Sequence, residues 1–165
     1  IVVDAPPDVA FDTIETLGGE TGWLYGDALW RIRGGIDQLF GGVGFRKGRR
    51  DDETLRVGDP VDFWRVEARE EDRLLRLRAE MRLPGRAWLQ YEVTPRNAEG
   101  TRSRVIQTVF FEPKGLLGTL YGTLAQLLHR PLFAGQLQAL ADRVEQRTPG
   151  SPSPPTDAAD LTGSP

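Results

Sequence analysis

Polar and aromatic side chains interrupt several apolar stretches of this sequence, and these are the residues whose types suit chemistry. Asp62 and Trp64 lie on one side of a predicted strand, and Glu80 and Trp88 flank a predicted turn. Gln107 lies among valines and phenylalanines. A polar group enclosed by a sheet needs a partner, and in a cavity that partner is a ligand or a bound water. We therefore predict that these five residues line a binding cavity.

The two carboxylates, Asp62 and Glu80, admit two interpretations. Burial would raise the pKa of either carboxyl group and make it a candidate general acid or base. However, Glu80 lies between Arg78 and Arg82, where surface ion pairing also explains it, and Asp62 can pair with a neighbouring arginine. We therefore predict no catalytic residue, and an acid/base role for Asp62 or Glu80 stays open as the alternative.

His129 is the single histidine, and it precedes Pro131 within a predicted helix. One imidazole without any cysteine cannot form a typical zinc site, and no Gly-x-Ser-x-Gly motif supplies a nucleophilic serine. A helix-end position is the default interpretation of His129, and a cavity position is the alternative. We include His129 and Tyr121 among the predicted ligand-binding residues, and we predict no metal site.

Two glycine-rich stretches invite comparison with phosphate-binding loops. Residues 18–22 lack the Lys-Ser/Thr pair of such a loop, so we interpret them as a structural turn that positions Trp23. Residues 41–44 lack the third glycine of a dinucleotide fingerprint and follow a predicted helix, so no cofactor is expected in this segment. A basic cluster at residues 46–50 precedes three acids, and local charge balance is preferred there over an anion site.

The composition of the chain narrows the classes of protein to which it can belong. The 165 residues include no cysteine, which excludes disulfides and thiolate chemistry and fits a cytoplasmic, reducing compartment. The net charge of −3 gives no electrostatic case for nucleic acid, and no apolar run is long enough to span a membrane. Because the chain begins at Ile1, we expect it to be cut from a longer protein.

The elements that must position these residues follow from hydrophobic periodicity. Residues 73–83 alternate apolar and charged, Pro84-Gly85 fits a type II turn, and residues 87–93 return as the partner strand. Residues 1–4 and 105–111 read as further strands. Two short helices are expected after the first strand, from Pro7 and over residues 28–39.

A long helix over residues 115–147 carries a helical stripe of apolar residues that Pro131 interrupts. The stripe consists of Leu117, Leu120, Tyr121, Leu124, Leu128, Phe133, Leu137, Leu140, Ala141 and Val144. A run of strands followed by such a helix predicts an α+β helix-grip fold, in which a curved antiparallel sheet of six or seven strands wraps around the helix. We expect one domain over residues 1–147 and a disordered tail over residues 148–165.

Several short sequence motifs, taken together, match the motifs of one protein domain family. They include Gly22-Trp23, Leu29-Trp30-Arg31, Gly58-Asp59, Asp62-Phe63-Trp64-Arg65-Val66, Ala79-Glu80-Met81, Leu83-Pro84-Gly85, Ala87-Trp88-Leu89 and Gln107-Thr108. With these motifs the chain resembles an uncharacterised domain family found fused behind NAD(P)-binding, short-chain-dehydrogenase-like (SDR) domains in bacterial proteins. That family is similar in architecture to the helix-grip, START-like superfamily, also called SRPBCC. The chain departs from it in the last helix, at Gly122, Thr123 and Leu127, where a cavity would be widened.

The resemblance implies an accessory or substrate-recognition domain that binds a small apolar molecule beside an upstream NAD(P)-binding domain in the same chain. Two alternatives from other classes stay open. One is a catalytic domain of the cyclase or hydratase type that uses Asp62 or Glu80. The other is a structural domain for oligomerisation, which a large exposed apolar patch would indicate.

Overall fold

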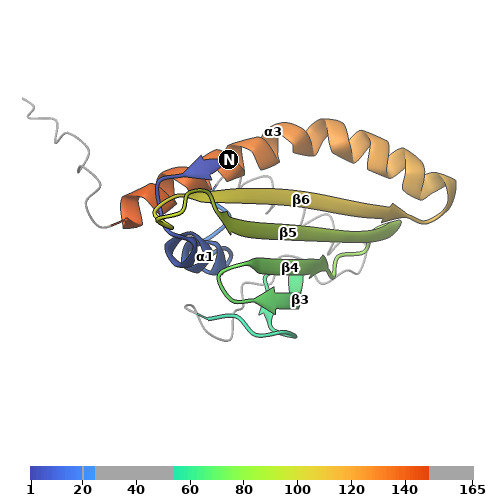
Figure 1. Ribbon diagram of the computed structural model, residues 1–165. Coiled ribbons are helices and arrows are strands. Elements are labelled where there is room, and N and C mark those ends of the chain that lie inside the picture. The colour runs from blue at the N-terminus through green and yellow to red at the C-terminus, as the bar shows by residue number, and fades with distance from the viewer. Residues whose placement is uncertain (20, 25–53, 149–165) are drawn as a thin grey trace, which may run out of the picture.

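The computed structural model describes residues 1–19, 21–24 and 54–148 (Figure 1). Four of the predicted features lie wholly or partly outside the described residues. They are the second short helix, the glycines at 41–44, the basic cluster at 46–50 and the tail from residue 149.

The described part of the chain contains one antiparallel sheet of six strands. The sequence predicted an α+β fold with six or seven antiparallel strands. The strands are β1 (Val2–Val3), β2 (Pro60–Val61), β3 (Trp64–Glu70), β4 (Leu74–Ala79), β5 (Gly85–Pro95) and β6 (Ser103–Pro113). Their order in the sheet is β1-β6-β5-β4-β3-β2, and every neighbouring pair is antiparallel. Two helices accompany them among the described residues, α1 (Pro7–Glu15) and α3 (Gly115–Arg147). Neither described helix is long and apolar enough to cross a membrane.

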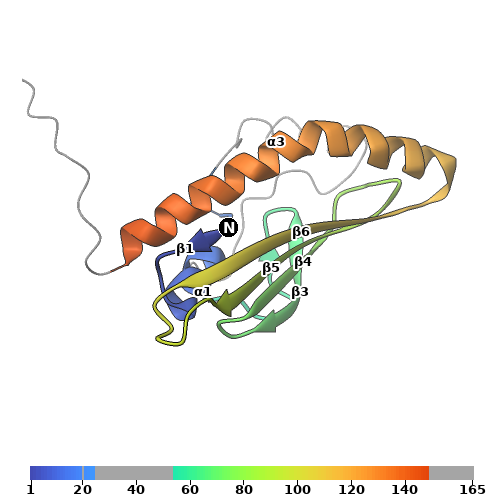
Figure 2. The same cartoon turned by 45° about the horizontal axis from the view of Figure 1, so that its top comes forward.

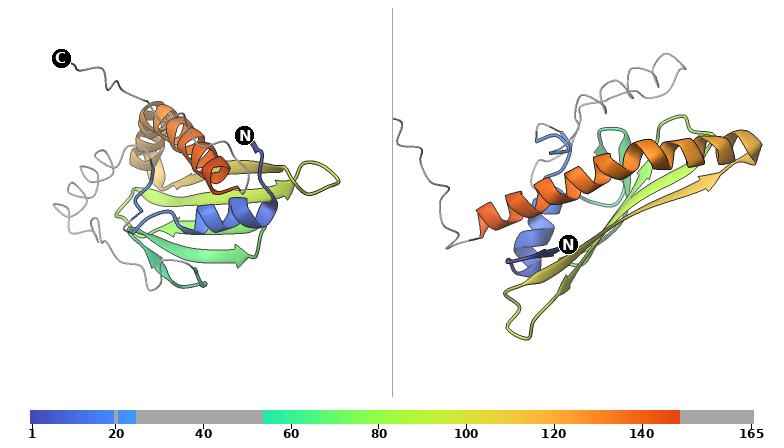
Figure 3. Two further views of the ribbon diagram at one scale, coloured as in Figure 1. Left: turned by 90° about the vertical axis from the view of Figure 1, so that its left-hand side faces the viewer. Right: turned by 90° about the horizontal axis from the view of Figure 1, so that it is seen from above.

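One face of the sheet is apolar because the strands alternate as their sequences predict. Leu75 and Leu77 of β4 pair with Tyr91 and Leu89 of β5, and all four side chains are buried. This inner face lies against α1 and α3 (Figure 3). Trp88 pairs with Arg78 and Phe110 and therefore belongs to the opposite, outer face.

The β4–β5 hairpin is confirmed, but its predicted tight turn is wrong. β4 ends at Ala79, β5 begins at Gly85, and the register pairs Arg78 with Trp88. The connection is therefore longer than a type II turn at Pro84-Gly85. The Lys114 backbone N–H donates to the Pro84 carbonyl oxygen at 2.9 Å, which ties this loop to the start of α3.

A tight turn lies within the strand that the sequence predicted around Asp62 and Trp64. Val61 of β2 pairs with Trp64 of β3, so Asp62 and Phe63 form a two-residue turn. Asp62 has a φ of 55°, which is a left-handed conformation that aspartate tolerates better than most residues. Because the chain reverses here, Phe63 and Trp64 are both buried.

Helix α1 is anchored by apolar packing and by one partly buried ion pair. Proline near its first turn starts the helix as predicted, and Phe11 and Ile14 are buried. A register shift after Val66 brings Arg69 opposite Leu75, on the inner face. Arg69 donates to both carboxylate oxygens of Glu15, at 2.6 and 2.9 Å, and so pairs the buried Glu15 carboxylate.

Helix α3 is continuous from Gly115 to Arg147, the bounds predicted from the sequence, and Pro131 lies inside it (Figure 1). The apolar stripe of its second half is buried at Leu140, Ala141 and Val144, as expected. In the first half the prediction fails, because Leu117, Leu120 and Leu124 are exposed. The inward side of that half instead carries small and aromatic residues.

Gly118 of α3 lies close to the backbone of Pro84, so a larger residue at this position should destabilise the protein. A Cβ atom at Gly118 would lie 2.2 Å from the Pro84 carbonyl oxygen, which is backbone and cannot turn aside. Although alanine favours a helix by about 1 kcal/mol over glycine, we expect Gly118→Ala to lower the free energy of unfolding by about 2 kcal/mol. Urea denaturation measures this change.

Gly122→Ala is the matched control. A Cβ atom there would meet the Phe111 ring at 2.8 Å, but that ring is a side chain that can shift. We expect a smaller loss of stability, below about 1 kcal/mol. A Gly118→Ala protein as stable as the wild type would contradict the described contact.

Candidate functional site

A cavity of about 520 Å³ lies between the first half of α3 and the sheet. Figure 2 shows α3 leaving the end of β6 and running back over the sheet. The cavity volume is within the range of about 300–1,000 Å³ that is usual for small-molecule sites.

The sheet wall of the cavity is apolar. Ala87 of β5 and Val109 and Phe111 of β6 contribute inner-face side chains. Met81 and Leu83, from the long β4–β5 connection, extend this wall. The extra length of that connection, which the sequence did not predict, therefore supplies part of the lining.

The helix wall is built from residues about one turn apart: Gly118, Gly122, Ala125 and His129, together with Tyr121. Because glycine and alanine project so little, α3 leaves room between itself and the sheet. The Tyr121 ring packs against Phe111, with 5.6 Å between ring centroids. Both rings belong to the cavity lining.

His129 lines the cavity from the middle of α3 and not from a helix end. Its Nδ1 lies 2.7 Å from the Ala125 carbonyl oxygen, which can only accept, so Nδ1–H donates. In the neutral ring Nε2 is then the acceptor nitrogen. The ring also stacks on Phe133, with 5.8 Å between centroids and 26° between planes. Its orientation is therefore fixed from two sides.

Trp64 is the buried polar side chain of the cavity wall. It is 3% exposed, and its indole N–H has no hydrogen-bond partner among the described residues. Buried polar groups are nearly always paired in folded proteins, and an exception deserves an explanation. An acceptor carried by a ligand or a water is one way to satisfy such a group.

Gln107 does not line this cavity but belongs to a second polar group on the same inner face. It pairs with Tyr91 across the sheet and donates through Nε2 to Gln136 Oε1 at 3.3 Å. Tyr91 Oη, Gln107 Oε1 and Gln136 Nε2 have no partner among the described residues. Burial raises the pKa of Tyr91 far above its usual range, so its hydroxyl group stays protonated.

Asp62 is buried, but it does not line the cavity. Its Oδ2 accepts the Trp23 indole N–H at 2.9 Å, and its carboxylate also accepts the Gly19 backbone N–H at 3.3 Å. A Cβ atom at Gly18 would lie 2.6 Å from Val61, so this turn requires glycine. The Gly18 backbone N–H donates to the Gly22 carbonyl oxygen at 2.8 Å, and Trp23 is fully buried, as expected of a structural turn that positions Trp23.

Glu80 also lies outside the cavity lining. Arg65 donates to both of its carboxylate oxygens, one of them at 3.0 Å, and the pair is partly exposed. Surface ion pairing was one of the two interpretations of Glu80 from the sequence, and its partner in the structure is Arg65 of β3. No group of three or more residues among the described ones offers the ligands for a metal ion.

Of the seven predicted ligand-binding residues, the structure brings three to the cavity: Trp64, Tyr121 and His129. Trp88 points to the outer face, and Asp62, Glu80 and Gln107 lie elsewhere. Sequence reasoning did not select Phe111, Gly122 or Ala125 as ligand-binding residues. The signals were present, since Phe111 shares the inward parity of Val109 and the first half of α3 is rich in small residues.

Comparisons with known proteins give a family but no activity. A family model described as "Protein of unknown function (DUF2867)" matches residues 1–136. The crystal structure of TTHA0849 from Thermus thermophilus is similar to the chain, with 15% sequence identity and a TM-score of 0.38. That similarity covers 87% of this chain and 92% of the other. No curated protein sequence matches the chain significantly.

Proposed function

The chain belongs to the family of proteins of unknown function DUF2867, and we propose that it binds a small, largely apolar molecule between α3 and the sheet. The observation that carries this proposal is the cavity of about 520 Å³, with its apolar sheet wall and its small-residue helix wall. Well-packed interiors contain few voids larger than a water molecule, so a space of this size suits an occupant.

The lining defines the chemistry of that occupant. Apolar walls favour a hydrocarbon or aromatic body, because its burial gains about 25 cal/mol per Å² of apolar surface. Thr119, Thr123 and Gln126 supply a few polar groups on the α3 side. Among the described residues no carboxylate lines the cavity and Arg130 is its cationic residue, which favours a neutral or weakly acidic ligand.

We propose further that this architecture is of the helix-grip, START-like type and that the chain serves an upstream NAD(P)-binding, SDR-like domain. The support for the first part is the long α3 over the inner face of an antiparallel sheet. The second part rests on the motif resemblance alone. In such a protein this domain would hold the substrate and the upstream domain would hold NAD(P). The cytoplasmic location stays a prediction.

The cyclase or hydratase alternative has less support. An acid/base carboxylate must reach the bound molecule, and neither Asp62 nor Glu80 lines the cavity. Both carboxylates accept hydrogen bonds from neighbouring side chains, which gives each a structural role. The binding proposal therefore accounts for more of the observed geometry.

Native mass spectrometry of the chain purified from its host tests the binding proposal. We expect an adduct of a few hundred daltons, within the size that a cavity of this volume accepts. Denaturing release should yield the molecule in apolar solvent. A compact protein that never carries an adduct and takes up no apolar probe would contradict the proposal.

A further inference from the structure

The first half of α3 carries a second apolar feature, which the binding proposal does not use. We call Leu117, Leu120, Leu124 and Leu127 the leucine stripe. These side chains are 71%, 69%, 57% and 68% exposed, and the adjacent Leu116 is 91% exposed. Exposed leucines are ordinary when scattered, but a contiguous set on one helix face indicates an interaction site.

The leucine stripe faces away from the cavity. Successive helical residues turn by about 100°, so the stripe is centred on the side of α3 opposite Gly118, Gly122 and His129, which line the cavity. The sheet and α1 pack against α3 from the cavity side. The views in Figures 2 and 3 agree that α3 lies at the outside of the described molecule.

The spacing of the leucine stripe is the spacing of helix–helix seams. Its members follow one another at intervals of three, four and three residues, which is the a/d pattern of paired helices. The pattern continues after Leu127 with Pro131 and Ala134, which are exposed and small or rigid. A second helix can therefore lie along this face over about three turns.

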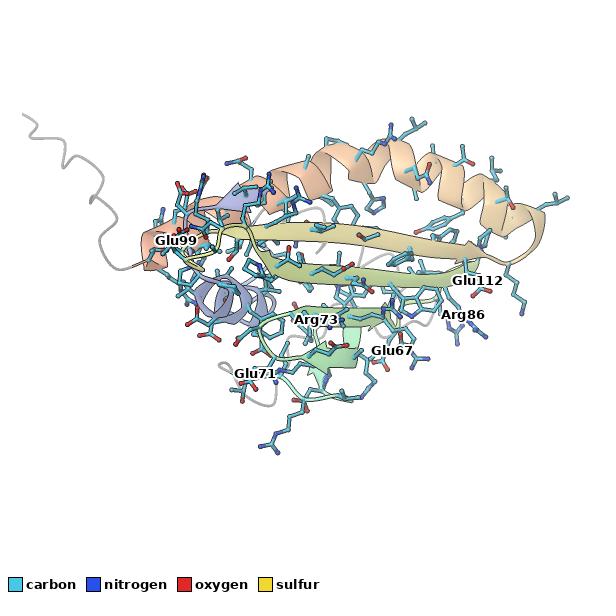
Figure 4. All side chains as sticks on the ribbon, viewed as in Figure 1. Glu67, Glu71, Arg73, Arg86, Glu99 and Glu112 are labelled. Carbon is cyan, nitrogen blue, oxygen red and sulfur yellow. The ribbon has the colours of Figure 1, made fainter. Side chains whose placement is uncertain are left out.

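Charge is absent from this part of the helix. From Gly115 to His129 the sequence contains no Asp, Glu, Lys or Arg. The charged residues labelled in Figure 4 lie around the sheet and its turns instead: Glu67, Glu71, Arg73, Arg86, Glu99 and Glu112. Two identical copies of the stripe can therefore approach without like-charge repulsion along it.

We propose that the leucine stripe is the interface between two copies of this chain, related by a two-fold axis. The four leucines of the stripe and the adjacent Leu116 together expose on the order of 600 Å² of apolar surface, at the upper end of patches on monomers. A standard interface buries about 800 Å² per partner, so these leucines supply most of what a stable dimer needs. A two-fold interface uses the same patch on both copies, and the stripe is self-complementary in this sense.

Sedimentation equilibrium with the double variant Leu120→Glu/Leu124→Glu tests the proposal. We expect the wild-type chain to dimerise and the double variant to dimerise at least about tenfold more weakly, because two carboxylates per copy would be buried against each other. Val57→Glu is the matched control. Val57 is 65% exposed and lies just before β2, the edge strand opposite β1, whereas α3 contacts the sheet mainly at β6 and β1. This variant should dimerise like the wild type.

Cysteine cross-linking gives an independent measurement, because the chain contains no cysteine of its own. Leu124→Cys alone should form disulfide-linked dimers if the two helices are parallel. A mixture of Leu120→Cys and Leu124→Cys should cross-link if they are antiparallel. Val57→Cys should do neither at the same protein concentration.

Three results would overturn the proposal. The first is a wild-type chain that stays monomeric up to about 1 mM, a concentration that corresponds to only about −4 kcal/mol of association. The second is a double variant that dimerises as tightly as the wild type while keeping its circular dichroism spectrum. The third is a monomer that sediments with vesicles of phosphatidylcholine and phosphatidylglycerol and is released by the double substitution, which would assign the stripe to a lipid surface.

Discussion

Replacing Ala125 with tryptophan is expected to weaken the uptake of an apolar probe by at least a hundredfold. Ala125 lines the helix wall, and the new indole would project into the space between α3 and the sheet. A hundredfold loss corresponds to about 2.7 kcal/mol, which is comparable to the burial of one large apolar group. The probe is N-phenyl-1-naphthylamine, an uncharged molecule whose fluorescence rises in apolar surroundings.

Ala98→Trp is the control for Ala125→Trp, because Ala98 is exposed in the β5–β6 turn and does not line the cavity. It should bind the probe like the wild type. The Ala125→Trp protein should remain folded, with a loss of helix propensity below about 1 kcal/mol. Unchanged probe binding in a folded Ala125→Trp protein would show that the cavity is not the binding site.

Replacing Asp62 with alanine is expected to lower the free energy of unfolding by about 3 kcal/mol. The carboxylate is 3% exposed and accepts hydrogen bonds from the Trp23 indole and the Gly19 backbone. Alanine would leave both donors buried without this partner, and it would hold a left-handed φ of 55° less readily than aspartate. Chemical denaturation monitored by tryptophan fluorescence would report the loss, since Trp23 is itself the reporter.

Asp62→Asn separates this structural role from a catalytic one. Asparagine keeps an acceptor oxygen and tolerates the left-handed conformation, so we expect it to retain most of the stability. A catalytic carboxylate would instead lose its activity in the asparagine variant while the fold survived. A stable Asp62→Ala protein would contradict the role described here for the turn at residues 18–23.

The cavity residues could be predicted only in part. The face of the sheet on which a residue lies depends on where its strand begins. Trp88 was selected as an aromatic residue in a strand, but its register with Arg78 and Phe110 puts it on the outer face. Asp62 and Trp64 were assigned to one side of a single strand. The chain reverses between Val61 and Trp64, so the carboxylate instead reaches the turn at residues 18–23.

The sequence by itself determined the elements whose signals are local. Alternation identified the strands on both sides of residue 84, proline placed the start of α1, and helical periodicity gave α3 its bounds. These patterns depend on neighbours within a few residues. They also sufficed for the order of the elements and for an antiparallel sheet with a C-terminal helix.

Only the tertiary structure decided which face of α3 is buried. In its second half the apolar stripe packs on the core, with Leu140 and Val144 buried. In its first half the small residues face the sheet and the leucines face outward, although periodicity alone favours the opposite orientation. The physical reason is that a continuous helix packs against the sheet with one rotation about its own axis. Packing of the second half fixes that rotation, and the first half must present to the sheet whichever residues then point inward.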